Sequence, residues 1–112
     1  MRWLAILVLL AVPMACAEDL PEHVELLPGA QDVEFAVDPP SKGAYKMIGE
    51  VVGIAAANDP DTAEFAARND LRNKAAELGA TLVTVDDSVG EAMPLRDKIK
   101  VKVYGRAFKS ID

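Results

Sequence analysis

The chain has 112 residues, of which 51% are hydrophobic and 27% are charged, and its formal net charge is −6. This length fits one domain, and the apolar content excludes an intrinsically disordered chain. The negative charge argues against a nucleic-acid-binding protein, and a single short apolar run excludes a multipass membrane protein.

The first 17 residues have the order of a secretory signal peptide. Met1 and Arg2 supply a positive start, residues 3–12 are uniformly apolar, and Pro13 ends the run. A bilayer-spanning helix needs roughly 20 apolar residues, so a permanent anchor or a buried helix is the less favoured alternative. We therefore predict a signal peptide at residues 1–17 and export to the periplasm or cell envelope.

Two processing sites compete at the end of this segment. Ala15-Cys16-Ala17 fits the small-x-small rule for signal cleavage, which would leave Glu18 as the first mature residue. Alternatively, Cys16 is the lipid attachment site of a lipoprotein, which would tether the domain to a membrane. We slightly favour the free form, which contains no cysteine and cannot form a disulfide.

Residues 18–42 form a leader that is interrupted by Pro21, by Pro28-Gly29 and by Pro39-Pro40. Within the leader, Val33, Phe35 and Val37 alternate with Glu34 and Ala36. This alternation is typical of a half-buried strand. We therefore predict that the leader includes one edge strand.

Residues 43–110 contain the clearest secondary-structure patterns. Residues 47–57 alternate as a strand, and one of its faces is small enough for a helix to approach closely. Asp59 and Pro60 suit a helix N-cap and first position, and Gly79 suits a left-handed stop. The stripe expected to pack on the sheet contains Ala63, Ala67, Leu71, Lys74, Ala75 and Leu78. Phe65 lies away from this stripe, and we expect the leader to cover it.

Two further strands are predicted, at residues 81–85 and 98–108, with a loop at residues 86–94 between them. In the last strand, Ile99, Val101 and Val103 should face the helix. The expected fold is α/β: a small β-α-β-β sheet of three strands, with a fourth N-terminal edge strand as an option, and one helix on one face. The first crossover should be right-handed and parallel, and the second connection a hairpin.

The sequence has few motifs that indicate catalysis or metal binding. No glycine-rich phosphate loop is present, His23 is the single histidine, and the predicted mature chain lacks cysteine, which argues against soft-metal binding. Asp86, Asp87, Glu91 and Asp97 offer oxygen ligands for Ca²⁺, but their spacing is not that of an EF-hand, and a solvated acidic loop is favoured. We predict no catalytic, cofactor-binding or metal-binding residues.

A basic row lies on the other face of the last strand, formed by Lys98, Lys100, Lys102 and Arg106. Tyr104 and Phe108 share this face, and aromatic residues beside positive charge suit interfaces. The row could contact anionic lipid, glycans or an acidic protein partner. A solvated face that charge protects from aggregation is the favoured interpretation.

Three segments resemble a family of small bacterial envelope lipoproteins, the uncharacterised YjeI type, which is related to the stress-sensing lipoprotein RcsF. The segments are residues 45–53 (YKMIGEVVG), residues 67–85, which hold the helix, Gly79-Ala80 and the next strand, and residues 99–108 with their Gly-Arg-Ala-Phe end. The likeness covers roughly residues 43–110. A looser likeness to the YbjQ family rests on the helix, the Gly-Ala pair and the same closing strand.

The YjeI resemblance implies an exported α/β domain, often lipid-anchored, that is not an enzyme. Family members often carry cysteines where this chain has Tyr45 and Ser110, so their disulfide is lost here. If those positions meet, the last strand lies between the other two. We expect a non-enzymatic envelope protein with a protein-interaction or envelope-stress role. The alternative is an oligomeric ligand- or metal-binding domain of the YbjQ kind, and a hydrolase is a remote third class.

Overall fold

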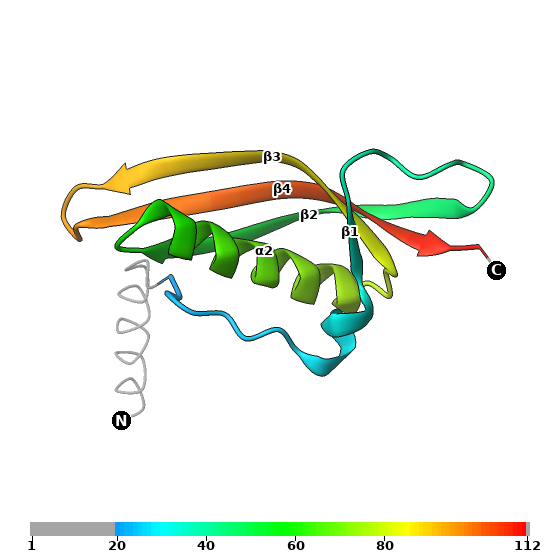
Figure 1. Cartoon of the computed structure of the whole chain (residues 1–112), viewed down its shortest axis with the longest axis horizontal. Coiled ribbons are helices and arrows are strands. Elements are labelled where there is room, and N and C mark those ends of the chain that lie inside the picture. The colour runs from blue at the N-terminus through cyan, green and yellow to red at the C-terminus, as the bar shows by residue number, and fades with distance from the viewer. Residues whose placement is uncertain (1–19, 112) are drawn as a thin grey trace, which may run out of the picture.

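The computed structural model describes residues 20–111, so the predicted signal peptide and Cys16 lie outside the described residues. The elements are a short 3₁₀ helix η1 (Pro28–Asp32), β1 (Glu34–Ala36), β2 (Tyr45–Ala57), α2 (Pro60–Glu77), β3 (Leu82–Met93) and β4 (Lys98–Ser110). Figure 1 shows α2 lying along one face of a single sheet. The predicted α/β class, with one helix on one face and a fourth edge strand, is confirmed. Within this part of the chain, no helix is long and apolar enough to span a bilayer.

The four strands have the order β1-β3-β4-β2. β4 is antiparallel to both β2 and β3, so β2 and β3 run in the same direction, as the strand-helix-strand order predicts. Tyr45 is the register partner of Ser110. The strand order inferred from these two positions is therefore confirmed. The leader strand β1 adds to the outer edge of β3 in parallel and covers only Leu82–Thr84.

β3 differs from its prediction, because the expected loop at residues 86–94 is strand as far as Met93. Seven consecutive residues of this half are exposed, and aspartate, glycine and serine are poor strand formers. These residues are held as a strand by pairing with β4, because Asp87–Met93 are in register with Lys98–Tyr104. A register shift between Val85 and Asp87 marks a bulge at Asp86.

The two ends of α2 follow the sequence prediction. Asp59 is the N-cap, and its carboxylate accepts the Thr62 backbone N–H at 3.1 Å and the Thr62 hydroxyl at 2.7 Å. These bonds lower the pKa of Asp59. Gly79 has a φ of 89°, a left-handed conformation that a glycine adopts at no steric cost.

Small residues bring α2 against the sheet backbone. The residues of α2 that are buried are Ala63, Ala66, Ala67, Leu71 and Ala75. A Cβ atom at Gly53 would overlap the carbonyl oxygen of Ala67 and lie 2.7 Å from the backbone nitrogen of Leu71. Four residues of the predicted stripe, Ala63, Ala67, Leu71 and Ala75, are therefore confirmed as buried. Leu78 is half exposed, because it is the C-cap residue, and Ala66 is an additional buried position.

The leader is ordered along α2 by side chains of the helix. Asn69 Nδ2 donates to the Val24 carbonyl and Asn73 Nδ2 to the Glu25 carbonyl, each at 2.9 Å. Arg72 donates to the carbonyls of Gln31 and Val33. The prediction that the leader covers Phe65 is wrong, since Phe65 is 68% exposed. The leader starts at the edge of β2, where Pro21 accepts the Ala56 N–H, and reaches the back of α2 only at Asn69.

Candidate interaction surface on the open face of the sheet

α2 covers one face of the sheet (Figure 1). We call the other face the open face, and β4 is one of the two inner strands. Val101, Val103, Gly105 and Ala107 are buried towards α2. The alternate positions lie on the open face, and they are the predicted surface residues Lys98, Lys100, Lys102, Tyr104 and Arg106. The structure therefore aligns all five in one row.

The neighbours of the lysines are mostly apolar. Lys102 lies in register with Ile54 of β2 and Val89 of β3, and Lys100 lies between Ala56 and Glu91. The lysines are half-buried, as expected where aliphatic stems cover apolar neighbours and leave the ammonium groups in water. The open face thus combines positive charge with accessible hydrocarbon, including Val89, which is 44% exposed.

Arg106 is held by the sheet itself. Its Nε and Nη2 atoms donate to the two carboxylate oxygens of Asp86 at 2.9 and 3.0 Å. This bidentate bond lowers the pKa of Asp86 and raises the pKa of Arg106. Asp86 lies at the bulge between Val85 and Asp87, and its carboxylate joins this irregular point of β3 to Arg106 of β4. Arg106 therefore fixes the bulge and has less freedom than the lysines to bind a partner.

The two aromatic residues of this row have different environments. Tyr104 is 38% exposed and lies between Val52 and Asp87. Phe108, expected on the exposed face, is only 7% exposed. Its register partners are Met47 and Leu82, so apolar side chains flank its ring on both sides, and the Arg106 guanidinium lies 6.0 Å from the ring centroid. Only Tyr104 is available for an interface.

The acidic residues considered for Ca²⁺ do not converge. Asp86 pairs with Arg106, Asp87 Oδ1 accepts the Ser88 N–H at 2.8 Å, and Glu91 is in register with Lys100. Asp97 is in the hairpin turn, with a φ of 52°. Within residues 20–111, no group of three potential metal ligands is found. The expected acidic loop is replaced by a strand whose carboxylates have separate roles.

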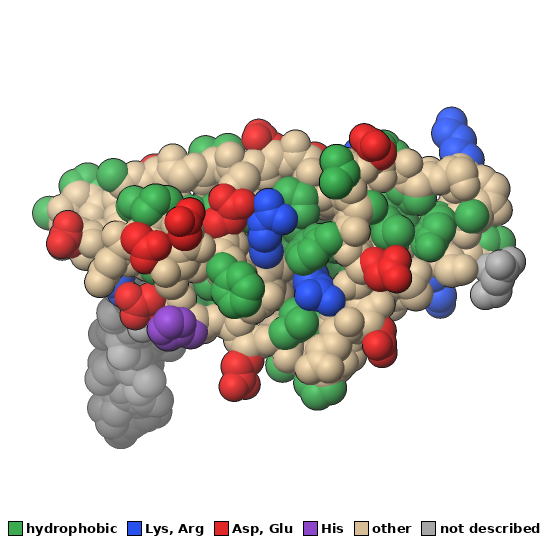
Figure 2. Space-filling model, viewed as in Figure 1, with side chains coloured by type: hydrophobic (Ala, Val, Ile, Leu, Met, Phe, Trp, Pro, Cys, Tyr) green, Lys and Arg blue, Asp and Glu red, His purple; other side chains and the backbone are tan. Residues whose placement is uncertain are grey.

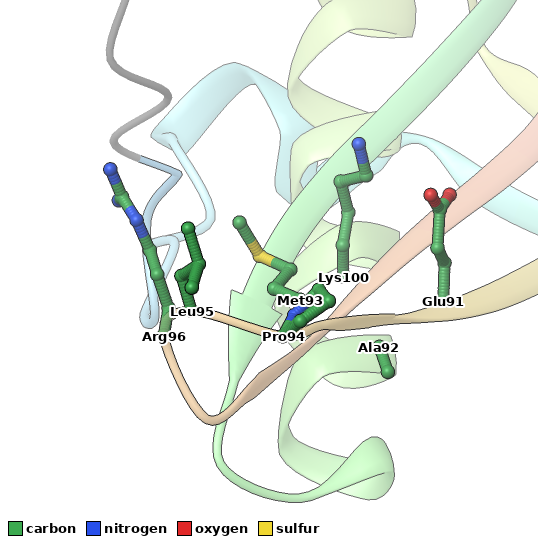
Figure 3. Close-up of a pocket in the computed structure, with 7 residues that line it drawn as sticks. All are labelled: Glu91, Ala92, Met93, Pro94, Leu95, Arg96 and Lys100. Atoms are coloured by element: carbon green, nitrogen blue, oxygen red, sulfur yellow. The ribbon is translucent and has the colours of Figure 1, made fainter.

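A shallow hollow of about 300 Å³ lies at the tip of the β3–β4 hairpin. Figure 3 shows Glu91, Met93, Leu95 and Lys100 extending to the same side of the hairpin, whereas Ala92 extends to the other. Leu95 is 98% exposed at the turn. The hollow therefore continues the mixed apolar and charged character of the open face to the end of the hairpin.

The helix side has a different surface. The ring of Phe35 lies 5.9 and 5.1 Å from the guanidinium carbons of Arg68 and Arg72. Figure 2 shows this side of the molecule, with hydrophobic side chains beside basic ones at its centre and acidic side chains gathered at the N-terminal end of α2. The two arginines attach β1 to α2, so their first role is structural. This cluster could not be predicted from the sequence, because its members are far apart in the chain.

No protein-family model matches the chain, and no curated protein matches it significantly.

Proposed function

We propose that the protein is a non-enzymatic, exported module of the cell envelope that binds another protein through the open face of its sheet. The observation that carries the proposal is the single row of Lys98, Lys100, Lys102 and Tyr104 on a face that α2 does not cover. The order of residues 1–17 supports export.

The chemistry of the row suits a protein partner. Lys98 and Lys102 form no ion pair within residues 20–111, so their charges are available to carboxylates. Tyr104 and Val89 offer apolar area beside these charges. Interfaces commonly combine such an apolar centre with a polar rim. A row kept charged only for solubility would not need an exposed tyrosine beside its lysines.

A photo-crosslinking pair tests this proposal in the cells that make the protein. A photoreactive phenylalanine replaces Tyr104 in one variant and Phe65 in the other. Both positions hold exposed aromatic residues, but they lie on opposite sides of the sheet. We expect a discrete protein adduct from position 104 and none from position 65. Equal adducts, or none from position 104, would overturn the proposal.

Two mass measurements complete the test. The mass of the mature N-terminus distinguishes cleavage after Ala17 from a lipid on Cys16, and an intact residue 1 would contradict the predicted signal peptide. The native mass of the mature domain addresses the YbjQ-like alternative. A monomer is expected, and a closed ring would instead support that oligomeric alternative.

A further inference from the structure

The outer edges of β2 and β3 differ in how their backbone groups are covered. At the outer edge of β2, the Ile54 N–H donates to Asp70 Oδ2 and the Val52 carbonyl accepts from Lys74 Nζ, both at 2.9 Å. The Ala56 N–H donates to the Pro21 carbonyl. Between Val52 and Ala56, the edge of β2 is therefore blocked to further strands by the helix and the leader. At the other edge, β1 covers β3 only as far as Thr84.

The register identifies which groups of β3 are left open. The backbone N–H and carbonyl of Ile54 point away from β4. Those of its register partner Lys102 therefore point towards β3, where they pair with the backbone groups of Val89. The intervening residues point outward. These are Ser88, Gly90 and Ala92.

Most of these outward groups have no partner within residues 20–111. The Ser88 N–H is bound by Asp87 Oδ1. The Ser88 carbonyl and both backbone groups of Gly90 and Ala92 make no bond with the described chain. An exposed, unpaired strand edge is a template for another strand.

Side chains around this edge define what fits. The outward residues are small, and they lie on the α2 side beyond the reach of the helix, where all three are exposed. On the open-face side, Asp87 and Glu91 border the edge. Residues 86–93 contain no basic residue, and the whole chain has a net charge of −6. Pairing with a second copy would place four carboxylates in one short ladder, so self-pairing is disfavoured.

We propose that the edge of β3 from Ser88 to Ala92 accepts an extended segment of a partner protein as an additional strand, with basic side chains at alternate positions beside Asp87 and Glu91. This inference rests on the proposed function and names how the partner is held. Backbone bonds to Gly90 and Ala92 give affinity, and the two carboxylates select the basic segment. The added strand extends the open face outward from the lysine row.

A seven-residue peptide that alternates lysine and valine is the probe. If the lysines lie beside Asp87 and Glu91, the valines lie directly opposite Ser88, Gly90 and Ala92, and their N–H groups face β3. We expect saturable binding, and slower hydrogen exchange of the Gly90 and Ala92 amides. Methylation of the valine nitrogens should abolish binding. Methylation of the lysine nitrogens, which point away, should leave it within about twofold.

Variants of the protein give the matching test. Gly90→Pro removes one outward donor and no bond to β4, since proline is tolerated where the N–H faces solvent. It should weaken the peptide about fivefold or more. Glu91→Gln should also weaken it and should reduce its salt dependence. Lys109→Gln, at an exposed position near the far end of β4, should change nothing.

The outcomes separate this inference from the proposed function. Equal binding of the two methylated peptides overturns the edge inference alone. The same holds if the unmodified peptide does not bind while a protein adduct still forms at position 104. Peptide-free self-association through Gly90 would overturn it in favour of a second copy. If the peptide does not bind and no adduct forms at position 104, the proposed function is overturned as well.

Discussion

The backbone amide of Ile54 donates to Oδ2 of Asp70 at 2.9 Å, which joins the outer edge of the sheet to the middle of α2. The same carboxylate is 2.9 Å from Lys74 Nζ, and this ammonium group also donates to the Val52 carbonyl. An i,i+4 ion pair on the helix thus supplies both a donor and an acceptor to β2. The pair closes an edge that would otherwise resemble that of β3.

Asp70→Ala should therefore destabilise the fold more than a surface substitution does. The change leaves the part-buried Ile54 N–H without its partner, which costs about 1–3 kcal/mol. Urea unfolding followed by circular dichroism measures this loss. Glu77→Ala, at an exposed position in the same helix, is the control and should stay within about 0.5 kcal/mol. Equal effects of the two changes would contradict a structural role for the Asp70 bond.

Gly53→Ala tests the close approach of helix and sheet. The new methyl group would overlap the Ala67 carbonyl, so α2 must move away from the sheet, and we expect a loss of about 3 kcal/mol. Gly43→Ala adds the same methyl group where no atom lies within 4 Å, and it should have little effect. Thermal unfolding of the two variants side by side makes the comparison. If Gly53→Ala is as stable as Gly43→Ala, the helix must lie further from β2 than the structure places it.

Leu71 and Phe65 provide a second matched pair, on one helix. Leu71 is fully buried, so Leu71→Ala should cost about 2–5 kcal/mol by leaving a cavity. Phe65 is 68% exposed, so Phe65→Ala should change stability by less than about 1 kcal/mol, although it removes more atoms. Chemical denaturation gives both values. A large effect at Phe65 would show that another segment covers its ring.

Features set by short stretches of sequence were predictable. Asp59, Pro60 and Gly79 define the ends of α2 through bonds and dihedral angles within a few residues, and the structure has them as expected. The alternation in residues 98–108 predicted which side of β4 is buried, because one face of a half-covered sheet must be apolar. The open-face row could therefore be identified from sequence.

Features set by distant partners were not predictable. Residues 86–93 have low strand propensity, and only β4 holds them in the sheet, so they were interpreted as a loop. The bonds from Asn69 and Asn73 reach residues that are 45 and 48 positions away in the chain. Phe108 is buried because Met47 and Leu82 flank it, and neither is near it in sequence. The one available signal for the longer β3 was the length of the last predicted strand: a hairpin with arms of equal length would extend β3 alongside it.

The Asp86–Arg106 pair predicts a specific dependence of stability on pH. The hydrogen bond from Arg106 lowers the pKa of Asp86 below its ordinary value of 3.8. A group whose pKa is lower in the folded state stabilises the fold above its unfolded pKa, and this contribution is lost as pH falls through the folded value. Asp86→Asn should therefore lower the melting temperature at pH 7, and the difference from wild type should shrink progressively below pH 3.8.

Asp87→Asn is the matched control, because it changes the neighbouring carboxylate, which has no arginine partner within residues 20–111. Its melting temperature should follow the wild-type pH profile more closely than that of Asp86→Asn. Raised salt should weaken the Asp86 effect, since about a third of each side chain in the pair is exposed to solvent. A difference between wild type and Asp86→Asn that stays constant down to pH 2 would mean that the bulge, and not the charge pair, accounts for the contribution of Asp86.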